Sequence, residues 1–123
     1  MSDELSALPP QVQERLLRLQ QLQQTLQSIL AQKQQVEAER TEVDQALDEL
    51  QKLGEDAVVY KATGSLMIKS EKNRITTELN ERKELLNTRA QVIAKQEERV
   101  RGQVKDVQAR LQQDLSPASP QPS

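Results

Sequence analysis

VVYKATGSLMIKS, residues 58–70, decides the fold of this chain, because it interrupts a sequence that otherwise has the composition of long helices. It contains Tyr60, the only Phe, Tyr or Trp in the 123 residues, and Gly64, one of three glycines. Short runs rich in strand-forming residues flank Thr63-Gly64, and glycine tolerates the positive φ of a tight turn. We therefore predict a β-hairpin over residues 57–69, in which 57–61 pairs with 65–69.

This hairpin carries more apolar side chains than it can bury by itself. A two-stranded hairpin is marginally stable in water, and open apolar strand edges promote association. We expect it to join hairpins of other chains in a shared sheet or barrel; the alternative is a loop that only caps the helices. The apolar side chains are expected on two faces, the first with Val58, Tyr60, Leu66 and Ile68 and the second with Val59 and Met67.

The residues on both sides of the hairpin repeat apolar side chains every seven positions, which is typical of coiled coils. Pro9-Pro10 suits a helix start and Gly54 a helix end, so we predict helices over residues 11–53 and 71–115. Helices of matching length joined by a short connection fold back antiparallel. The columns of the first helix are Val12, Leu19, Leu26, Lys33, Arg40 and Leu47, and Leu22, Ile29, Val36, Val43 and Leu50. Those of the second are Leu79, Leu86, Ile93, Val100 and Val107, and Lys83, Ala90, Glu97, Val104 and Leu111.

The predicted fold class is therefore mainly α, an antiparallel two-helix coiled coil with one β-hairpin between the helices. It forms a single domain over residues 1–115. Residues 116–123, SPASPQPS, are a tail that its composition predicts to be disordered.

The free ends of the two helices are more apolar than the middle of the seam. A two-stranded coil buries little beyond its two columns, so Leu16 and Leu17 are expected to stay partly exposed. Exposed apolar surface often marks a binding site, although single exposed leucines are also common on helices. Both interpretations stay open from the residues alone.

Composition excludes several classes of function. The chain has no Cys and no His, which removes disulfides, thiolate or imidazole metal sites and the usual nucleophile–base pairs. The net charge of -2 is mixed along the chain, with no basic face for nucleic acid. No stretch is long and apolar enough to cross a membrane, and the N-terminus does not read as a signal peptide. We expect a cytoplasmic protein without metal, cofactor, nucleic acid or membrane partner.

An enzyme is not expected either. Its best candidates are carboxylates that stand among Lys and Arg on polar helix faces, where a solvated charge pattern explains them. No sequence around them suggests a shielded pocket. These carboxylates are Glu37, Glu39, Glu97 and Glu98.

Five motifs resemble those of a known family. They are PPQVQ at 9–13, QLQQ at 21–24, QALDELQKL at 45–53, VYKATGSLMIK at 59–69 and QEERV at 96–100. Together with the helix–hairpin–helix layout, they resemble the beta-type subunit of prefoldin, in its archaeal form. The single hairpin agrees with the beta type, because alpha-type subunits of this family carry two.

The resemblance implies a hexamer of two alpha-type and four beta-type subunits, whose hairpins build a double β-barrel. It further implies that the coiled-coil tips capture non-native proteins without ATP and pass them to a group II chaperonin. The implied oligomerisation residues are Val58, Val59, Tyr60, Leu66, Met67 and Ile68. The implied client-binding residues are Val12, Leu16, Leu17, Leu19, Leu22, Val104, Val107, Leu111 and Leu115. The alternative function is a structural coiled-coil scaffold with one defined partner.

Overall fold

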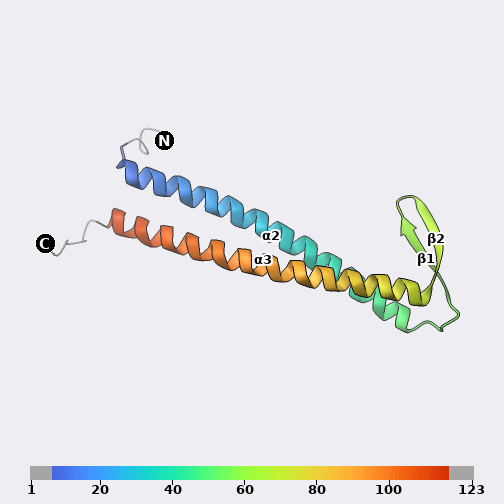
Figure 1. The fold of residues 1–123 in the computed structure, drawn as a ribbon. Coiled ribbons are helices and arrows are strands. Elements are labelled where there is room, and N and C mark those ends of the chain that lie inside the picture. The colour runs from blue at the N-terminus through green and yellow to red at the C-terminus, as the bar shows by residue number, and fades with distance from the viewer. Residues whose placement is uncertain (1–6, 117–123) are drawn as a thin grey trace. The chain divides into compact units, whose positions relative to one another are not determined.

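A computed structural model describes residues 7–116 and shows two long helices with an antiparallel hairpin between them (Figure 1). This confirms the predicted fold. The elements are α2 (Pro10–Gln51), β1 (Val58–Thr63), β2 (Leu66–Glu71) and α3 (Lys72–Leu115). Apart from Ser116, the tail predicted to be disordered lies outside the described residues.

The ends of α2 follow from local hydrogen bonding. Proline suits the first position of a helix, and Pro9 O accepts the N–H groups of Val12 and Gln13 at 3.0 and 3.1 Å. At the other end α2 stops at Gln51, two residues before the predicted boundary. There the N–H of Leu53 bonds to the carbonyl of Leu50, three residues back, at 3.1 Å. The last turn therefore tightens, as helix ends commonly do.

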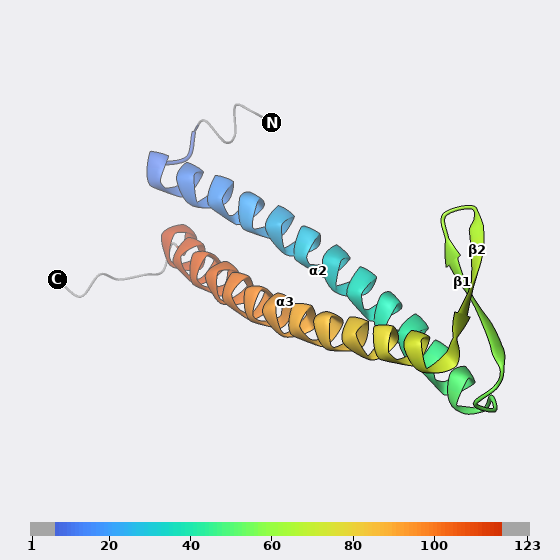
Figure 2. The same ribbon diagram turned by 45° about the vertical axis from the view of Figure 1, so that its right-hand side comes forward.

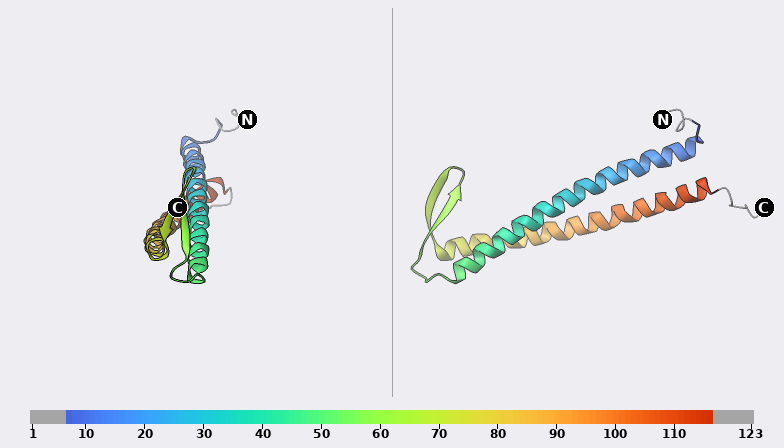
Figure 3. Two further views of the ribbon diagram at one scale, coloured as in Figure 1. Left: turned by 90° about the vertical axis from the view of Figure 1, so that its right-hand side faces the viewer. Right: turned by 180° about the vertical axis from the view of Figure 1, so that it is seen from behind.

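The start of α3 is tied to the end of α2. No residue separates the end of β2, Glu71, from the start of α3, Lys72 (Figure 3). The Nζ atom of Lys72 donates a hydrogen bond of 2.7 Å to the carbonyl of Leu53. This cation satisfies one of the carbonyls left without a partner beyond the end of α2, where positive charge is favoured.

The hairpin turns on Gly64 and Ser65, because Thr63 pairs directly with Leu66. Gly64 has φ +60°, whereas Ser65 does not have a positive φ. This combination is that of a type II′ turn, which requires glycine at its first central position. The predicted pairing leaves a loop over 62–64, whereas the observed turn comprises 64–65, and the strands extend to Thr63 and Glu71 rather than to Lys61 and Lys69.

The described residues divide into two compact units. The hairpin unit comprises residues 32–93, with the hairpin and the adjoining parts of both helices. The terminal unit comprises residues 7–31 and 94–116, with the outer ends of both helices. Each unit has its own portion of the apolar seam between α2 and α3.

In the hairpin unit, the seam is built from one column of each helix. Leu86 and Val36 are its most buried side chains, at 0% and 1% exposure, and Val43, Leu50 and Ile93 are buried beside them. Two ion pairs flank this seam and join the helices: Arg82–Glu39 at 2.7 Å and Lys83–Asp44 at 3.0 Å. In the terminal unit, the buried apolar residues are Val12, Leu22, Ile29, Val100 and Leu111.

Candidate functional site

The hairpin is the most exposed apolar segment of the hairpin unit. Its large apolar side chains are between 50% and 67% exposed, and Val59 alone among the predicted oligomerisation residues is half-buried. Both outer edges of the two-stranded sheet are open (Figure 2). Side chains of this kind are normally covered in a folded assembly. The exposed ones are Val58, Tyr60, Leu66, Met67 and Ile68.

The register assigns the apolar side chains to two faces, and it corrects the predicted grouping. Directly opposed residues of an antiparallel pair share a face, and Tyr60 opposes Lys69 while Lys61 opposes Ile68. The Tyr60 face therefore consists of Val58, Tyr60, Ala62, Met67, Lys69 and Glu71. The Lys61 face consists of Val59, Lys61, Thr63, Leu66, Ile68 and Ser70. The predicted grouping of Tyr60 with Leu66 and Ile68 is wrong, because the predicted pairing of 57–61 with 65–69 leaves a three-residue loop, whereas the observed turn has two residues. A change from an odd to an even number of loop residues moves each side chain of one strand to the other face.

The Lys61 face is linked to α3. The Nζ atom of Lys61 donates a 3.0 Å hydrogen bond to Oε2 of Glu78, two turns into the helix. Arg74 lies on the other side of the same carboxylate, with its Nε 3.7 Å from Oε1. The half-buried strand residues, Val59 and Ser70, belong to this face as well. The Tyr60 face is thus the more open of the two.

The predicted client-binding residues occupy three environments in the terminal unit. Val12, Leu22 and Leu111 are buried in the seam, at 4% to 6% exposure. Leu17 and Leu115 are 60% and 55% exposed. The half-buried members are Leu16, Leu19, Val104 and Val107.

In the terminal unit, an ion pair also joins α2 to α3. Arg15 occupies the seam column of Leu22, seven residues earlier, and its guanidinium pairs with the carboxylate of Asp114 on α3. The side chains are only 25% and 18% exposed. This ion pair stands where the column would otherwise have an apolar contact. At this level of the seam, the buried apolar side chain of α2 is Val12, from the neighbouring column.

A shallow apolar hollow lies on α2 in the terminal unit. It has a volume of about 370 Å³ and is lined by Gln13, Leu16, Leu17 and Gln20. Positions three, four and seven residues apart lie along one face of a helix, so the two leucines form its floor and the glutamines its ends. The hollow suits an apolar side chain of a binding partner more than a polar small molecule.

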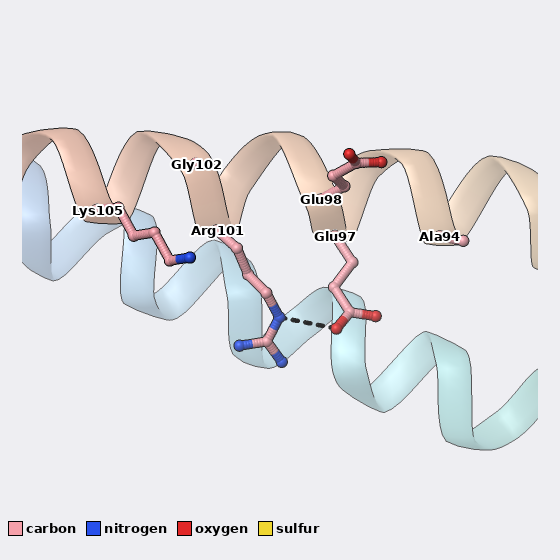
Figure 4. Close-up of a pocket in the computed structure, with 6 residues that line it drawn as sticks. All are labelled: Ala94, Glu97, Glu98, Arg101, Gly102 and Lys105. Atoms are coloured by element: carbon pink, nitrogen blue, oxygen red, sulfur yellow. Dashed lines mark hydrogen bonds and ion pairs between the residues drawn. The ribbon is translucent and has the colours of Figure 1, made fainter.

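A second hollow, of about 570 Å³, lies on α3 and is strongly charged (Figure 4). Its residues all come from one helix, and the guanidinium of Arg101 bonds to Glu97 Oε2 one turn away at 2.8 Å. A carboxylate and a guanidinium so paired on a helix surface form an i,i+4 contact rather than a site for chemistry. The lining residues are Ala94, Glu97, Glu98, Arg101, Gly102 and Lys105.

Several surface features were not predicted from the sequence. They include the Lys61–Glu78 and Arg15–Asp114 pairs and two exposed apolar residues of α3, Leu85 and Val92. The seven-residue spacing of Leu85 and Val92 could have indicated a second apolar stripe. The ion pairs depend on how the elements face one another. The sequence alone does not show which of its many acidic and basic residues come together.

Within residues 7–116, no cluster of three or more acidic, His or Cys side chains could hold a metal ion. In the same part of the chain, neither helix is long and apolar enough to span a membrane.

Comparison with known proteins decides the family. Residues 13–117 match the family model for a prefoldin subunit. Prefoldin subunit beta of Methanothrix thermoacetophila is 47% identical over 113 residues, which cover 92% of this chain and 94% of that protein. This chain belongs to the prefoldin family, as a beta-type subunit. Prefoldin subunit beta of Archaeoglobus fulgidus is 43% identical over 92% of the chain and 97% of its own length.

A solved prefoldin structure has the same fold. The crystal structure of the prefoldin beta subunit from Thermococcus strain KS-1 matches with a TM-score of 0.82 at 42% identity, and covers 89% of this chain and 96% of that one. The predicted resemblance to beta-type prefoldin is thereby confirmed. Prefoldin subunits are chaperone components that assemble with other prefoldin subunits.

Proposed function

We propose that this chain is a subunit of an ATP-independent holdase, which captures unfolded proteins with the terminal unit and assembles through the hairpin. The observation that carries the proposal is that the hairpin and the terminal unit each expose large apolar side chains, in addition to those of Leu85 and Val92 on α3. The hairpin is a sheet with open edges, and the terminal unit has a helix surface with exposed leucines. A sheet favours a partner of fixed geometry, whereas scattered leucines suit partners that differ.

The assembly is proposed to be a hexamer of two alpha-type and four beta-type subunits, with the hairpins closed into β-barrels. Closure of a barrel removes the open edges that a lone hairpin has. Apolar side chains on both faces of the hairpin support such an arrangement, because both faces then find cover. The residues proposed for this contact are Val58, Val59, Tyr60, Leu66, Met67 and Ile68.

Clients are proposed to bind first at Leu16, Leu17 and Leu115, which are accessible without any change in the helices. Each contact is weak, but several terminal units around one client add their affinities by multivalency. The buried residues Val12 and Leu111 reach a client only where the helices separate locally. Weak contacts also permit release, which suits transfer to a group II chaperonin in the cytoplasm.

The test is light scattering of a denatured client protein diluted into buffer without ATP. The chain, mixed with an alpha-type partner from the same source, is expected to suppress aggregation of the client. The same complex lacking residues 1–19 and 105–123 of this chain is expected to assemble but not to suppress aggregation. Size-exclusion chromatography with multi-angle scattering checks that both complexes are assembled.

No suppression by a complex shown to be fully assembled would overturn the holdase proposal. A structural scaffold with one defined partner would then explain the two surfaces better. Suppression that survives removal of the ends would keep the holdase activity and move the client site away from the terminal unit.

A further inference from the structure

The hairpin is attached to the rest of the hairpin unit at few points. On one side β2 continues directly into α3, and on the other the loop 52–57 connects α2 to β1 (Figure 2). A strand joined to a helix without a linker can still pivot about the dihedral angles of the junction, here Glu71 and Lys72. The angle of the hairpin therefore needs a second contact if it is to be fixed.

The Lys61–Glu78 ion pair is that second contact. It joins the middle of β1 to the second turn of α3 across 17 residues of sequence, with Nζ and Oε2 3.0 Å apart. Within residues 7–116 it is the single hydrogen bond or ion pair between a strand side chain and either helix. Because Lys61 is on the face opposite Tyr60, the bond turns the Lys61 face toward α3 and leaves the Tyr60 face open.

We propose that Lys61 and Glu78 act as a positioning pair, which sets the angle of the hairpin on α3 so that the Tyr60 face is presented to the hairpins of neighbouring subunits. This inference rests on the proposed assembly through the hairpin. Neither residue needs to touch a neighbour for this role. Arg74 supports the pair by holding the other oxygen of the Glu78 carboxylate.

The effect of one such pair on one chain is small, because its side chains are 52% and 39% exposed and solvent screens their attraction. In a closed assembly the effects of the pair in the separate copies combine, since each copy of the chain must present its hairpin at the same angle. A factor of about 2 per chain becomes a factor of about 16 over four copies, if the contributions add. Assembly should therefore respond more strongly than the stability of the single chain.

The experiment measures the overall equilibrium constant for assembly with an alpha-type partner, by native mass spectrometry over a dilution series. Lys61→Glu and Glu78→Lys are each expected to lower this constant about 10-fold or more, because two like charges then face each other. The double variant that carries both substitutions is expected to return to within about 3-fold of wild type. Lys61→Arg keeps the charge and should assemble normally.

Two controls make the test specific. Arg74→Gln removes a charge beside Glu78 without breaking the link to the hairpin, and should change the assembly constant by about 2-fold at most. Circular dichroism of each chain should show unchanged helix content, since the pair adds little to the helices themselves. The defect of Lys61→Glu relative to wild type should shrink in 1 M NaCl, because salt screens the attraction in wild type and the repulsion in the variant.

Assembly defects in both single variants that the double variant does not repair would overturn the proposal, and so would normal assembly of both single variants. Tyr60→Asp separates this inference from the proposed function, because it places a charge on the Tyr60 face itself. If Tyr60→Asp blocks assembly while Lys61→Glu does not, only the positioning pair is rejected. If Tyr60→Asp also assembles normally, the hairpin is not the assembly surface and both proposals fail.

Discussion

Gly102 is an exposed glycine inside α3, and it has no contact that explains it. A Cβ atom added there would meet nothing within 4 Å. Glycine inside a helix costs stability because the unfolded chain has more freedom to lose. We predict that Gly102→Ala raises the free energy of unfolding by about 0.5–1 kcal/mol, measured by urea denaturation.

Gly64 provides the matched control. An added Cβ there also meets nothing within 4 Å, but the backbone has φ +60°, which other residues adopt at a cost. Gly64→Ala should therefore lower stability or assembly while Gly102→Ala raises stability. A loss of stability in Gly102→Ala would contradict a regular helix at that position.

The faces of the hairpin show where reasoning from the residues stops. The presence of a hairpin around Gly64 followed from the sequence, because two strand-forming runs flank a turn residue. Its register did not, because glycine serves both at the end of a three-residue loop over 62–64 and at the first central position of a two-residue turn with Ser65. The two loops differ by one residue in length, and that residue decides whether Tyr60 shares its face with Met67 or with Ile68.

At the scale of the helices, the heptad columns predicted the seam well in the middle and less well at the ends. Each member of the column from Leu22 to Leu50 is buried, at 1% to 7% exposure. One heptad earlier that column holds Arg15, and Val12 from the neighbouring column is buried instead. A straight helix drifts by about 20° per heptad against a seven-residue repeat, so the buried column changes over a few turns. The sequence pattern alone does not show where the change occurs.

Leu86 and Leu85 test this seam with neighbouring leucines of one helix. Leu86 is completely buried and Leu85 is 52% exposed. Leu86→Ala should lower the free energy of unfolding by about 2–5 kcal/mol, because it leaves a cavity between the helices. Leu85→Ala should change it by about 0.5 kcal/mol or less. Chemical denaturation of both variants measures the difference, and equal losses would mean that α3 is rotated from the orientation described.

At the scale of the whole molecule, exposed apolar residues occur on the helices of both units. Leu17 and Leu115 in the terminal unit are 60% and 55% exposed, and Leu85 and Val92 in the hairpin unit are 52% and 51% exposed. The two sets of residues are therefore nearly equal in exposure but belong to different units. A chaperone that binds clients through a defined unit should depend on the first set alone. One that binds through any exposed apolar surface should depend on both.

The last prediction uses this equality. The double variant with Leu17→Ser and Leu115→Ser should assemble normally, because neither side chain is in the seam, and should require about three times more complex to suppress client aggregation. The double variant with Leu85→Ser and Val92→Ser loses similar exposed apolar area and should suppress aggregation like wild type. Light scattering at matched concentrations of assembled complex compares them. Equal losses would locate client binding on the whole helical surface, and a loss confined to the second variant would place it in the hairpin unit, because each substitution removes apolar area from one unit only.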